Sequence, residues 1–436
     1  MPKRLKPVLT LGRDYAILLA GAVIMGVVVA GFAIATDKAQ EIFAALSHHI
    51  KLLPLVISPA IFAVSLWVVL RYFPAASGSG VPQSIAAQHV TSQADRQHLL
   101  GFPVAVAKFL LVLLALLGGA SLGREGPSVQ IGAAIMLLFA DITRVPDKRT
   151  FITAGAAAGL AAAFNTPITG IAFLLEDMLK GKPFKDRLTM LAIILLSGVA
   201  AIAVTGSYDY YGHIQPEMDL NKLWLPVIVV GVICGLSGSV FNIFITRGRK
   251  HICRMFGGFG GKRPVAFAAL CGFAVAMLGI SSGGVTFGSG YEIGHDLLHG
   301  VTAPAWWHPF AKIAATAISV ISGIPGGTIS PSLSIGATIG GALTPLFPGT
   351  PVAVIVLLAI AGYFAAFTQS PITAAVIVLE ISGKATAVIP LLAVAIIAAA
   401  VSRALFPQSI FDLLADTIVA DLHKHKKKDD ISHYDA

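Results

Sequence analysis

The sequence predicts an all-α polytopic membrane protein, on three observations. Charged residues make up only 12% of the 436 residues, about half of the roughly 25% that is typical of soluble proteins. Hydrophobic residues make up 56%, and the mean hydropathy is +0.81. Apolar runs recur along the chain, and several approach the ~20 residues that cross a bilayer as one helix. This composition excludes a soluble enzyme, a secreted disulfide scaffold and a disordered protein, because the chain cannot supply a charged surface.

Breaks in the apolar runs predict helices that begin and end inside the membrane. Glycine and proline interrupt the hydrophobic pattern at residues 78–82, 123–127 and 323–331. Irregular backbone at membrane depth is tolerated only where it is buried in protein or lines a watery cavity. The broken helices therefore indicate an ion or substrate pathway.

Two pairs of matching motifs indicate an internal repeat. Pro127 and Pro331 lie in the similar stretches GPSVQIGA and SPSLSIGA, 204 residues apart (331 − 127). Glu176 and Glu380 follow similar Ala-Ala-Phe and Pro-Ile-Thr stretches at the same separation (380 − 176). Repeats in membrane proteins usually build a site at their interface. The motifs by themselves leave open whether the two halves are parallel or inverted.

The repeat divides the chain into membrane repeat 1 (residues 15–206), a linker (207–222) and membrane repeat 2 (223–415). An N-terminal segment (1–14) precedes them and a basic tail (416–436) follows. Both end segments carry clustered lysine or arginine, and such segments tend to stay in the cytoplasm. We therefore expect both termini to be cytoplasmic. Topology and lipid headgroups explain these short basic runs, so no nucleic-acid partner is predicted.

The segment Gly-Arg-Glu-Gly-Pro at 123–127 places two ionisable residues between apolar runs. Charges at that depth are expensive and are usually functional or paired. Pro127 favours the first turn of a helix, and free N–H groups at a helix N-terminus attract anions. Glu125 could occupy such an anion site when ionised and leave it when protonated. A structural ion pair between Arg124 and Glu125 is the alternative, and these residues alone do not decide between the two.

Two further segments offer neutral hydrogen-bond donors. Ser79 lies between two glycines before Val-Pro, and residues 323–331 repeat the Glu125 segment with Ile329 in place of the glutamate. An ordinary Gly/Ser turn is the plainer interpretation of the first. Together the three segments would form a cage of donors that selects anions by charge.

Two other patterns are weaker. His295 and His299 have the i, i+4 spacing of helical zinc sites, but a glutamate base and a third ligand are missing, so no metal site is predicted. Gly288-Ser289-Gly290 lacks the context of a phosphate-binding loop and is rejected as one. No nucleophile motif stands out, so the protein is not predicted to be an enzyme, and no cofactor is expected.

The segments GSGVP, GREGP and GIPGG…P, in that order, resemble the three signature segments of the CLC family of chloride channels and proton/chloride antiporters. Lys108 and the stretch FNTPITGIAFLLED also resemble that family, and the resemblance covers roughly residues 15–415. It implies a helical fold of two inverted-topology repeats with broken and tilted helices. It also implies a homodimer with one pore per subunit, and chloride as the bound substrate ion.

The resemblance assigns roles residue by residue. Ser79 would donate its hydroxyl to a central chloride, with Gly78 lining the inner approach. The amides of Thr328 and Ile329 would hold the same ion. Glu125 would be the gating glutamate that competes with chloride and carries the proton on the outer side.

Two further positions depart from the family pattern. The second proton acid of the family's antiporters falls at Asp177, where they commonly have glutamate. Phe411 stands where the family usually has tyrosine, so one donor to the central anion is lost. Fluoride-exporting relatives usually replace the serine of the first motif, so Ser79 favours chloride.

The resemblance therefore implies proton-coupled chloride antiport, with a passive or weakly coupled chloride channel as the alternative. The sequence is short and has no stretch that resembles the family's C-terminal regulatory domain, so by resemblance we expect a prokaryotic protein of the inner membrane.

Overall fold

The computed structural model is almost entirely helical. It describes residues 5–143, 145, 147–181, 186–206, 210–212, 214, 220–255, 263–301, 305–383 and 388–434. Within these ranges, strand pairing is limited to two isolated bridges, Gly78 with Pro325 and Gly123 with Gly327. The prediction of an all-α chain is confirmed.

The first half of the chain contains α1 (Leu5–His49), α2 (Pro54–Tyr72), the 3-10 turn η1 (Pro74–Ala76), α3 (Val81–His89), α4 (Gln93–Leu100), α5 (Phe102–Leu117), α6 (Glu125–Ile142), α7 (Lys148–Phe164), α8 (Pro167–Phe173), the π-helical turn η2 (Leu174–Leu179) and α9 (Arg187–Thr205). The second half contains α10 (Leu220–Met255), α11 (Arg263–Ser281), α12 (Tyr291–Leu298), α13 (His308–Ile321), α14 (Ile329–Leu343), the 3-10 turn η3 (Thr344–Leu346), α15 (Val352–Thr368), α16 (Pro371–Ser382), α17 (Val388–Leu405) and α18 (Ile410–Tyr434).

Eight helices among the described residues are long and apolar enough to cross a bilayer. They lie in Gly12–His49, Pro54–Tyr72, Gln93–Leu117, Glu125–Ile142, Arg187–Thr205, Lys222–Gly248, Pro264–Ser281 and Val388–Leu405. Three shorter apolar helices, α13, α15 and α16, lie between them. The protein is therefore an integral membrane protein whose spans alternate with shorter helices, as the interrupted apolar runs predict.

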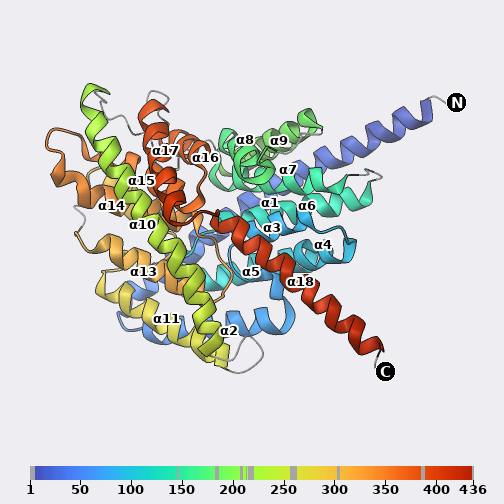
Figure 1. Ribbon diagram of the computed structural model, residues 1–436, viewed down its shortest axis with the longest axis horizontal. Helices are drawn as coiled ribbons and strands as arrows, with labels where there is room; N and C mark the ends of the chain where they lie inside the picture. The colour runs from blue at the N-terminus through green and yellow to red at the C-terminus, as the bar shows by residue number, and fades with distance from the viewer. Residues whose placement is uncertain are drawn as a thin grey trace.

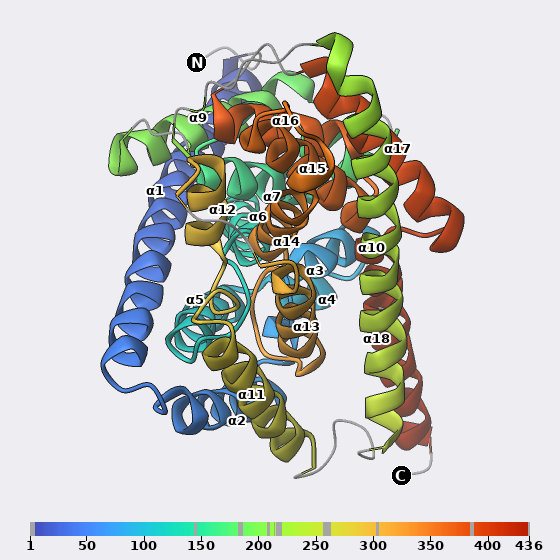
Figure 2. The same ribbon diagram turned by 90° about the vertical axis from the view of Figure 1, so that its left-hand side faces the viewer.

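Equivalent helices of the two halves pack in equivalent pairs. In the first half, α6 packs on α7 and α1 on α9; in the second, α14 packs on α15 and α10 on α17. Between the halves, α2 packs on α11 and α8 packs on α16. Figure 2 shows α2 beside α11 at one edge of the molecule. The last helix, α18, packs on α3 of the first half.

The same sharp turn precedes α8 in the first half and α16 in the second. Asn165 after α7 and Gln369 after α15 both adopt left-handed backbone, with φ of 62° and 64°. Asparagine tolerates this region better than most residues. At the second position, Arg403 donates to the backbone oxygen of Gln369 at 2.7 Å. Pro167 and Pro371 then start α8 and α16, where a missing N–H costs nothing.

Two glutamates join the halves by reciprocal capping. The Glu176 carboxylate accepts hydrogen bonds from the backbone N–H groups of Ile372 (3.1 Å) and Thr373 (2.6 Å) in the first turn of α16. The Glu380 carboxylate accepts from the N–H groups at the start of α8, at 3.0 Å and 2.5 Å. Carboxylates at helix N-termini satisfy donors that have no intrahelical partner. The equivalent positions of these glutamates, seen in the sequence repeat, thus have a structural reason.

Most of the predicted linker, residues 207–222, lies outside the described residues. The helix α10 begins at Leu220, just before the predicted start of the second repeat. The helix α18 runs continuously across the predicted boundary at residue 415. In Figure 1, the first turn of α1 and the last turn of α18 both lie toward the right of the molecule.

The close crossing of α6 and α7 gives a stability prediction. A Cβ at Gly155 would stand 2.6 Å from the Gly132 carbonyl oxygen and 2.7 Å from the Met136 Cβ. Overpacking of this kind costs about 1–3 kcal/mol, so Gly155→Ala should lower the midpoint of thermal unfolding in detergent. Gly31→Ala is the control, because nothing lies within 4 Å of its Cβ position and alanine favours a helix. Equal midpoints for the two variants would contradict the packing.

Candidate functional site

Backbone hydrogen bonds join the three glycine-rich segments, residues 78–82, 123–127 and 323–331. The Gly78 N–H donates to the Ile324 oxygen (3.3 Å), and the Gly326 N–H donates back to the Gly78 oxygen (3.1 Å). Gly123 and Gly327 exchange two bonds, at 2.8 Å and 2.7 Å. The segment 324–327 of the second half is therefore held between two segments of the first half.

Three helices begin beside this backbone ladder. They are α3 at Val81, α6 at Glu125 and α14 at Ile329. The first N–H groups of a helix have no intrahelical partner, and this end of the helix is electropositive. Among the described residues, the buried hydroxyls of Ser79 and Thr328 also have no hydrogen-bond partner. The sequence prediction that these residue types form one group of donors agrees with this placement.

Glycine is required where the three segments touch. A Cβ at Gly126 would stand 2.2 Å from the Ser79 hydroxyl oxygen. A Cβ at Gly327 would stand 2.9 Å from the Gly126 nitrogen, and one at Gly80 would stand 2.8 Å from the Gly126 oxygen. Real Cβ atoms do not approach so closely, so Ser79 lies directly against the backbone that follows Glu125.

A buried lysine binds the backbone of the loop that carries Ser79. Lys108 is 0% exposed, and its Nζ donates to the backbone oxygens of Ala76 (2.9 Å), Ser77 (3.4 Å) and Gly78 (2.6 Å). A buried ammonium makes its surroundings favourable for an anion.

Glu125 is 1% exposed and lies against the start of α14. Its Oε2 accepts a hydrogen bond from the Ser330 N–H at 3.3 Å. The guanidinium of Arg124 is more distant, with Nε 3.9 Å from Glu125 Oε1. Arg124 instead donates to Asp37 and to the Ala33 oxygen (2.9 Å) on α1. Of the two interpretations left open by the sequence, the geometry favours a carboxylate at a helix N-terminus over a close pair with Arg124.

Asp177 lies in the π-helical turn η2 and is 3% exposed. Its carboxylate accepts hydrogen bonds from the hydroxyls of Ser370 (2.6 Å) and Thr373 (3.2 Å) at the start of α16. The neighbouring residues contact different groups at the start of α16: Glu176 accepts from backbone N–H groups, and Asp177 accepts from hydroxyls. Turns of π-helix often occur at functional sites. Asp177 also lines a cavity of about 260 Å³.

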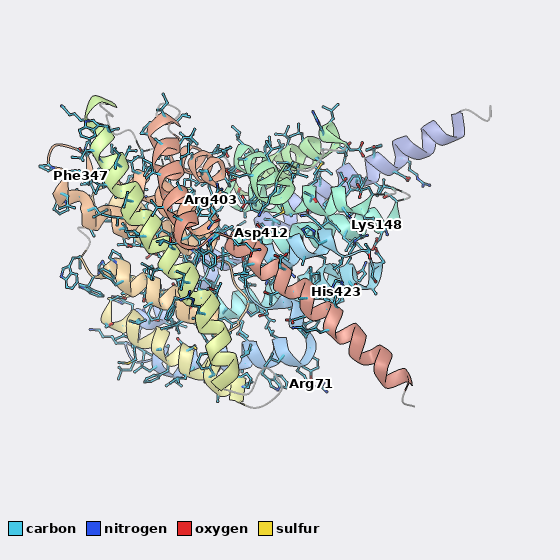
Figure 3. All side chains as sticks on the ribbon, viewed as in Figure 1. Arg71, Lys148, Phe347, Arg403, Asp412 and His423 are labelled. Atoms are coloured by element: carbon cyan, nitrogen blue, oxygen red, sulfur yellow. The ribbon has the colours of Figure 1, made fainter. Side chains whose placement is uncertain are left out.

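The cavity beside Asp177 has a polar lining. It is bounded by Ile85, His89, Asp177, Met178, Lys180, Gln408, Asp412 and Asp416. Lys180 forms an ion pair with Asp412, which Figure 3 labels in the first turn of α18. The cavity thus connects a buried acid with charged residues of α18.

Phe411 begins the same helix and is 2% exposed. Its ring packs edge-to-face on Phe367 of α15, with centroids 5.6 Å apart. The helix that carries it packs on α3, which follows Ser79. The described contacts join Phe411 to the aromatic core and do not reach Ser79.

Sequence reasoning missed two features of the site. The partner of Arg124 is Asp37 on α1, and no motif or spacing indicates this contact. The second is Lys312, which is buried like Lys108 and stands 204 residues after it (312 − 108). The repeat offset could have found Lys312.

The duplicated broken-helix architecture and the donor-lined centre define a class of membrane protein with an ion pathway between two repeats. The family model described as voltage gated chloride channel matches residues 60–403. The chain belongs to this family, so the resemblance drawn from the three signature segments is confirmed. The family and the similar solved structures are channels and transporters by name, not enzymes.

Solved structures share the fold at low sequence identity. A slow cyanobacterial Cl⁻/H⁺ antiporter matches with a TM-score of 0.80 and 24% identity over 94% of this chain and 98% of that chain. A CLC-type fluoride/proton antiporter matches with a TM-score of 0.76 and 22% identity over 91% and 97%. A eukaryotic CLC transporter matches with a TM-score of 0.72 and 20% identity over 92% and 74%. These matches confirm the predicted CLC fold of two inverted repeats.

Proposed function

We propose that the protein exchanges chloride for protons across a membrane, with Glu125 as the gate. One observation carries the proposal: the Glu125 carboxylate lies on the first-turn amide of α14, beside the Ser79 loop. An ionised carboxylate there competes with an anion for the electropositive start of α14, because Ser330 directly follows Thr328 and Ile329. A protonated carboxyl group does not need this position and releases it to the anion. Proton binding and anion binding are thereby linked at one place.

The donors at the centre suit a mobile halide. We assign the central chloride to the hydroxyl of Ser79 and the amides of Thr328 and Ile329, with Gly78 on the inner approach. These donors are neutral, and the buried ammonium of Lys108 binds backbone oxygens of the Ser79 loop. Neutral donors hold an anion weakly enough for it to leave, as conduction requires. The names of the matched antiporters, for chloride and fluoride, support anion exchange.

Asp177 is proposed as the inner proton acid. It is buried but borders the polar cavity, so a proton can reach it through water without crossing the anion site. The hydroxyls of Ser370 and Thr373 can donate to the ionised form or accept from the protonated one. The shorter side chain of aspartate is compensated on this view by the π-helical turn that carries it.

A passive or weakly coupled chloride channel of the same fold is the second candidate. Phe411 supports it, because a phenylalanine cannot donate to the anion, and its ring packs on Phe367. A lost hydrogen bond to a charged group is worth about 1.5–3 kcal/mol. Weaker anion occupancy would weaken the competition with Glu125 and allow uncoupled flux.

The assembly and orientation belong to the same proposal. We propose a homodimer in a bacterial inner membrane, surrounded by lipid and without a cofactor. Cytoplasmic placement of both termini is supported by their basic residues.

Glu125→Gln tests the gate. The amide keeps the size of the side chain but cannot lose a proton, so chloride-driven proton movement should fall to the background of protein-free liposomes. Chloride flux should persist. Both are measured in the same reconstituted liposomes with a chloride electrode and a pH electrode. The wild type is the control and should move protons uphill under a chloride gradient; retained proton movement in the variant would refute the assignment.

Asp177→Asn tests the inner acid. The amide can still bond to Ser370 and Thr373, so the fold should be preserved while proton transfer stops. We expect chloride flux to remain and the number of protons moved per chloride to drop toward zero. Glu176→Gln is the matched control, because that neighbouring acid caps α16 and should leave the ratio unchanged. An unchanged ratio in Asp177→Asn would place the proton path elsewhere.

Phe411→Tyr tests the second candidate. If residue 411 faces the central anion, the new hydroxyl should tighten chloride binding about tenfold or more, as one added charged hydrogen bond allows. Coupling should improve with it. Isothermal titration of chloride into the detergent-solubilised protein measures the affinity. Unchanged affinity would show that residue 411 does not face the anion, consistent with its packing on Phe367.

A further inference from the structure

The loop before α12 repeats the loop before α3. Gly288-Ser289-Gly290 precedes α12 as Gly78-Ser79-Gly80 precedes α3. Both glycines of each loop have left-handed backbone, with φ of 59° and 76° in the second loop and 64° and 106° in the first. The sequence Gly-Ser-Gly was rejected above as a phosphate loop, and the structure gives it a different meaning. Residues 288–290 are the counterpart, in the second half, of the loop 78–80 that carries Ser79.

A buried lysine supports the second loop in the same way. Lys312 is 0% exposed, and its Nζ donates to the backbone oxygens of Thr286 (3.1 Å), Phe287 (3.4 Å) and Gly288 (3.0 Å). Within the described residues, no carboxylate lies within ion-pair distance of it. A buried cation without an acid partner is costly. An anion in the loop would lower that cost, as we propose for Lys108 and the Ser79 loop.

Two polar side chains, Gln40 and Ser334, lie against the second loop. The Ser289 N–H donates to the Gln40 Oε1 of α1 at 2.7 Å. Ser334 of α14 is 0% exposed, and among the described residues its hydroxyl has no hydrogen-bond partner. That hydroxyl oxygen would lie 2.1 Å from a Cβ at Gly290, so it points into the loop. Figure 2 shows α12 beside α14, which brings the two together.

The corresponding position in the first half explains why this hydroxyl is free. Gln130 stands 204 residues before Ser334 (334 − 130) and lies under Gly80, with its Cβ 2.9 Å from that Cβ position. Its amide nitrogen donates to the backbone oxygens of Ala75 and Leu99. Glutamine is thus long enough to find partners, whereas the hydroxyl of the shorter serine has no partner among the described residues.

We propose that residues 288–290 form a second binding site for a small monovalent anion of the halide class. The Ser289 N–H and the Ser334 hydroxyl are its donors, and Lys312 supplies the countercharge. The side-chain oxygen of Gln40 holds the Ser289 N–H until an anion displaces it. This site is separate from the Ser79 site and does not depend on proton coupling.

Contacts within α1 connect Gln40 to Arg124. The Gln40 amide nitrogen lies 3.4 Å from the Thr36 backbone oxygen, and Arg124 contacts the Thr36 hydroxyl at 3.4 Å. Arg124 immediately precedes Glu125. Gln40 is therefore connected through Thr36 to the residue that precedes Glu125.

Bromide diffraction on crystals of the full chain tests the site. In Gln40→Ala, an anomalous bromide peak should appear at the Ser289 N–H, in addition to the peak at Ser79. In the wild type the same peak should appear at lower occupancy, because the anion must first displace Gln40. In Gln40→Glu, a carboxylate oxygen should keep the N–H, so the second peak should be absent. A Gln40→Ala crystal with a Ser79 peak and no Ser289 peak would overturn the proposal. An equal Ser289 peak in Gln40→Glu would overturn the role of Gln40.

Binding stoichiometry tests the same site without crystals. In equilibrium dialysis with radioactive chloride, Gln40→Ala should bind one more anion per chain than Gln40→Glu. Equal numbers would refute the second site. Gln40 is only partly buried, so the chain should tolerate both changes, and size-exclusion chromatography checks the fold. Loss of all binding, including at Ser79, would contradict the central anion site instead.

Discussion

The structure depends on the pairing of one short segment, residues 324–327, with Gly78 on one side and Gly123 on the other. These few backbone hydrogen bonds bring three helix starts together at the interface of the two repeats. Glycine makes the pairing possible, because at Gly126 and Gly327 a single added carbon would collide with the neighbouring segment. The donor group, the position of Glu125 and the exclusion of bulky side chains all follow from it.

The two repeats have equivalent backbone segments at the site, but they carry different side chains at equivalent positions. One helix start carries Glu125 and the other carries Ile329 at the equivalent position, so only one of the two starts has a carboxyl group. The Ser79 hydroxyl is left without a described partner, whereas the Ser289 amide is held by Gln40. The same loop thus carries a serine hydroxyl without a described partner in one half and a serine amide bound by a glutamine side chain in the other.

The sequence predicts the fold class, the repeat and the three segments well, because each depends on local signals: apolar length, glycine and proline at breaks, and a constant offset. It does not predict contacts between distant helices. Arg124 therefore looked like a possible partner for Glu125, whereas it binds Asp37 on α1. The surroundings of Phe411 also depend on how α18 packs, and no local pattern encodes that.

In the proposed mechanism, chloride and the ionised carboxylate of Glu125 compete for the electropositive start of α14. Chloride binding must then favour the protonated carboxyl group, and by linkage protonation must favour chloride. Proton exchange during chloride titration of the detergent-solubilised protein in weakly buffered solution measures this directly. The account predicts net proton uptake on chloride binding, tighter chloride binding as the pH falls, and loss of both effects in Glu125→Gln. Chloride binding without proton uptake would contradict it.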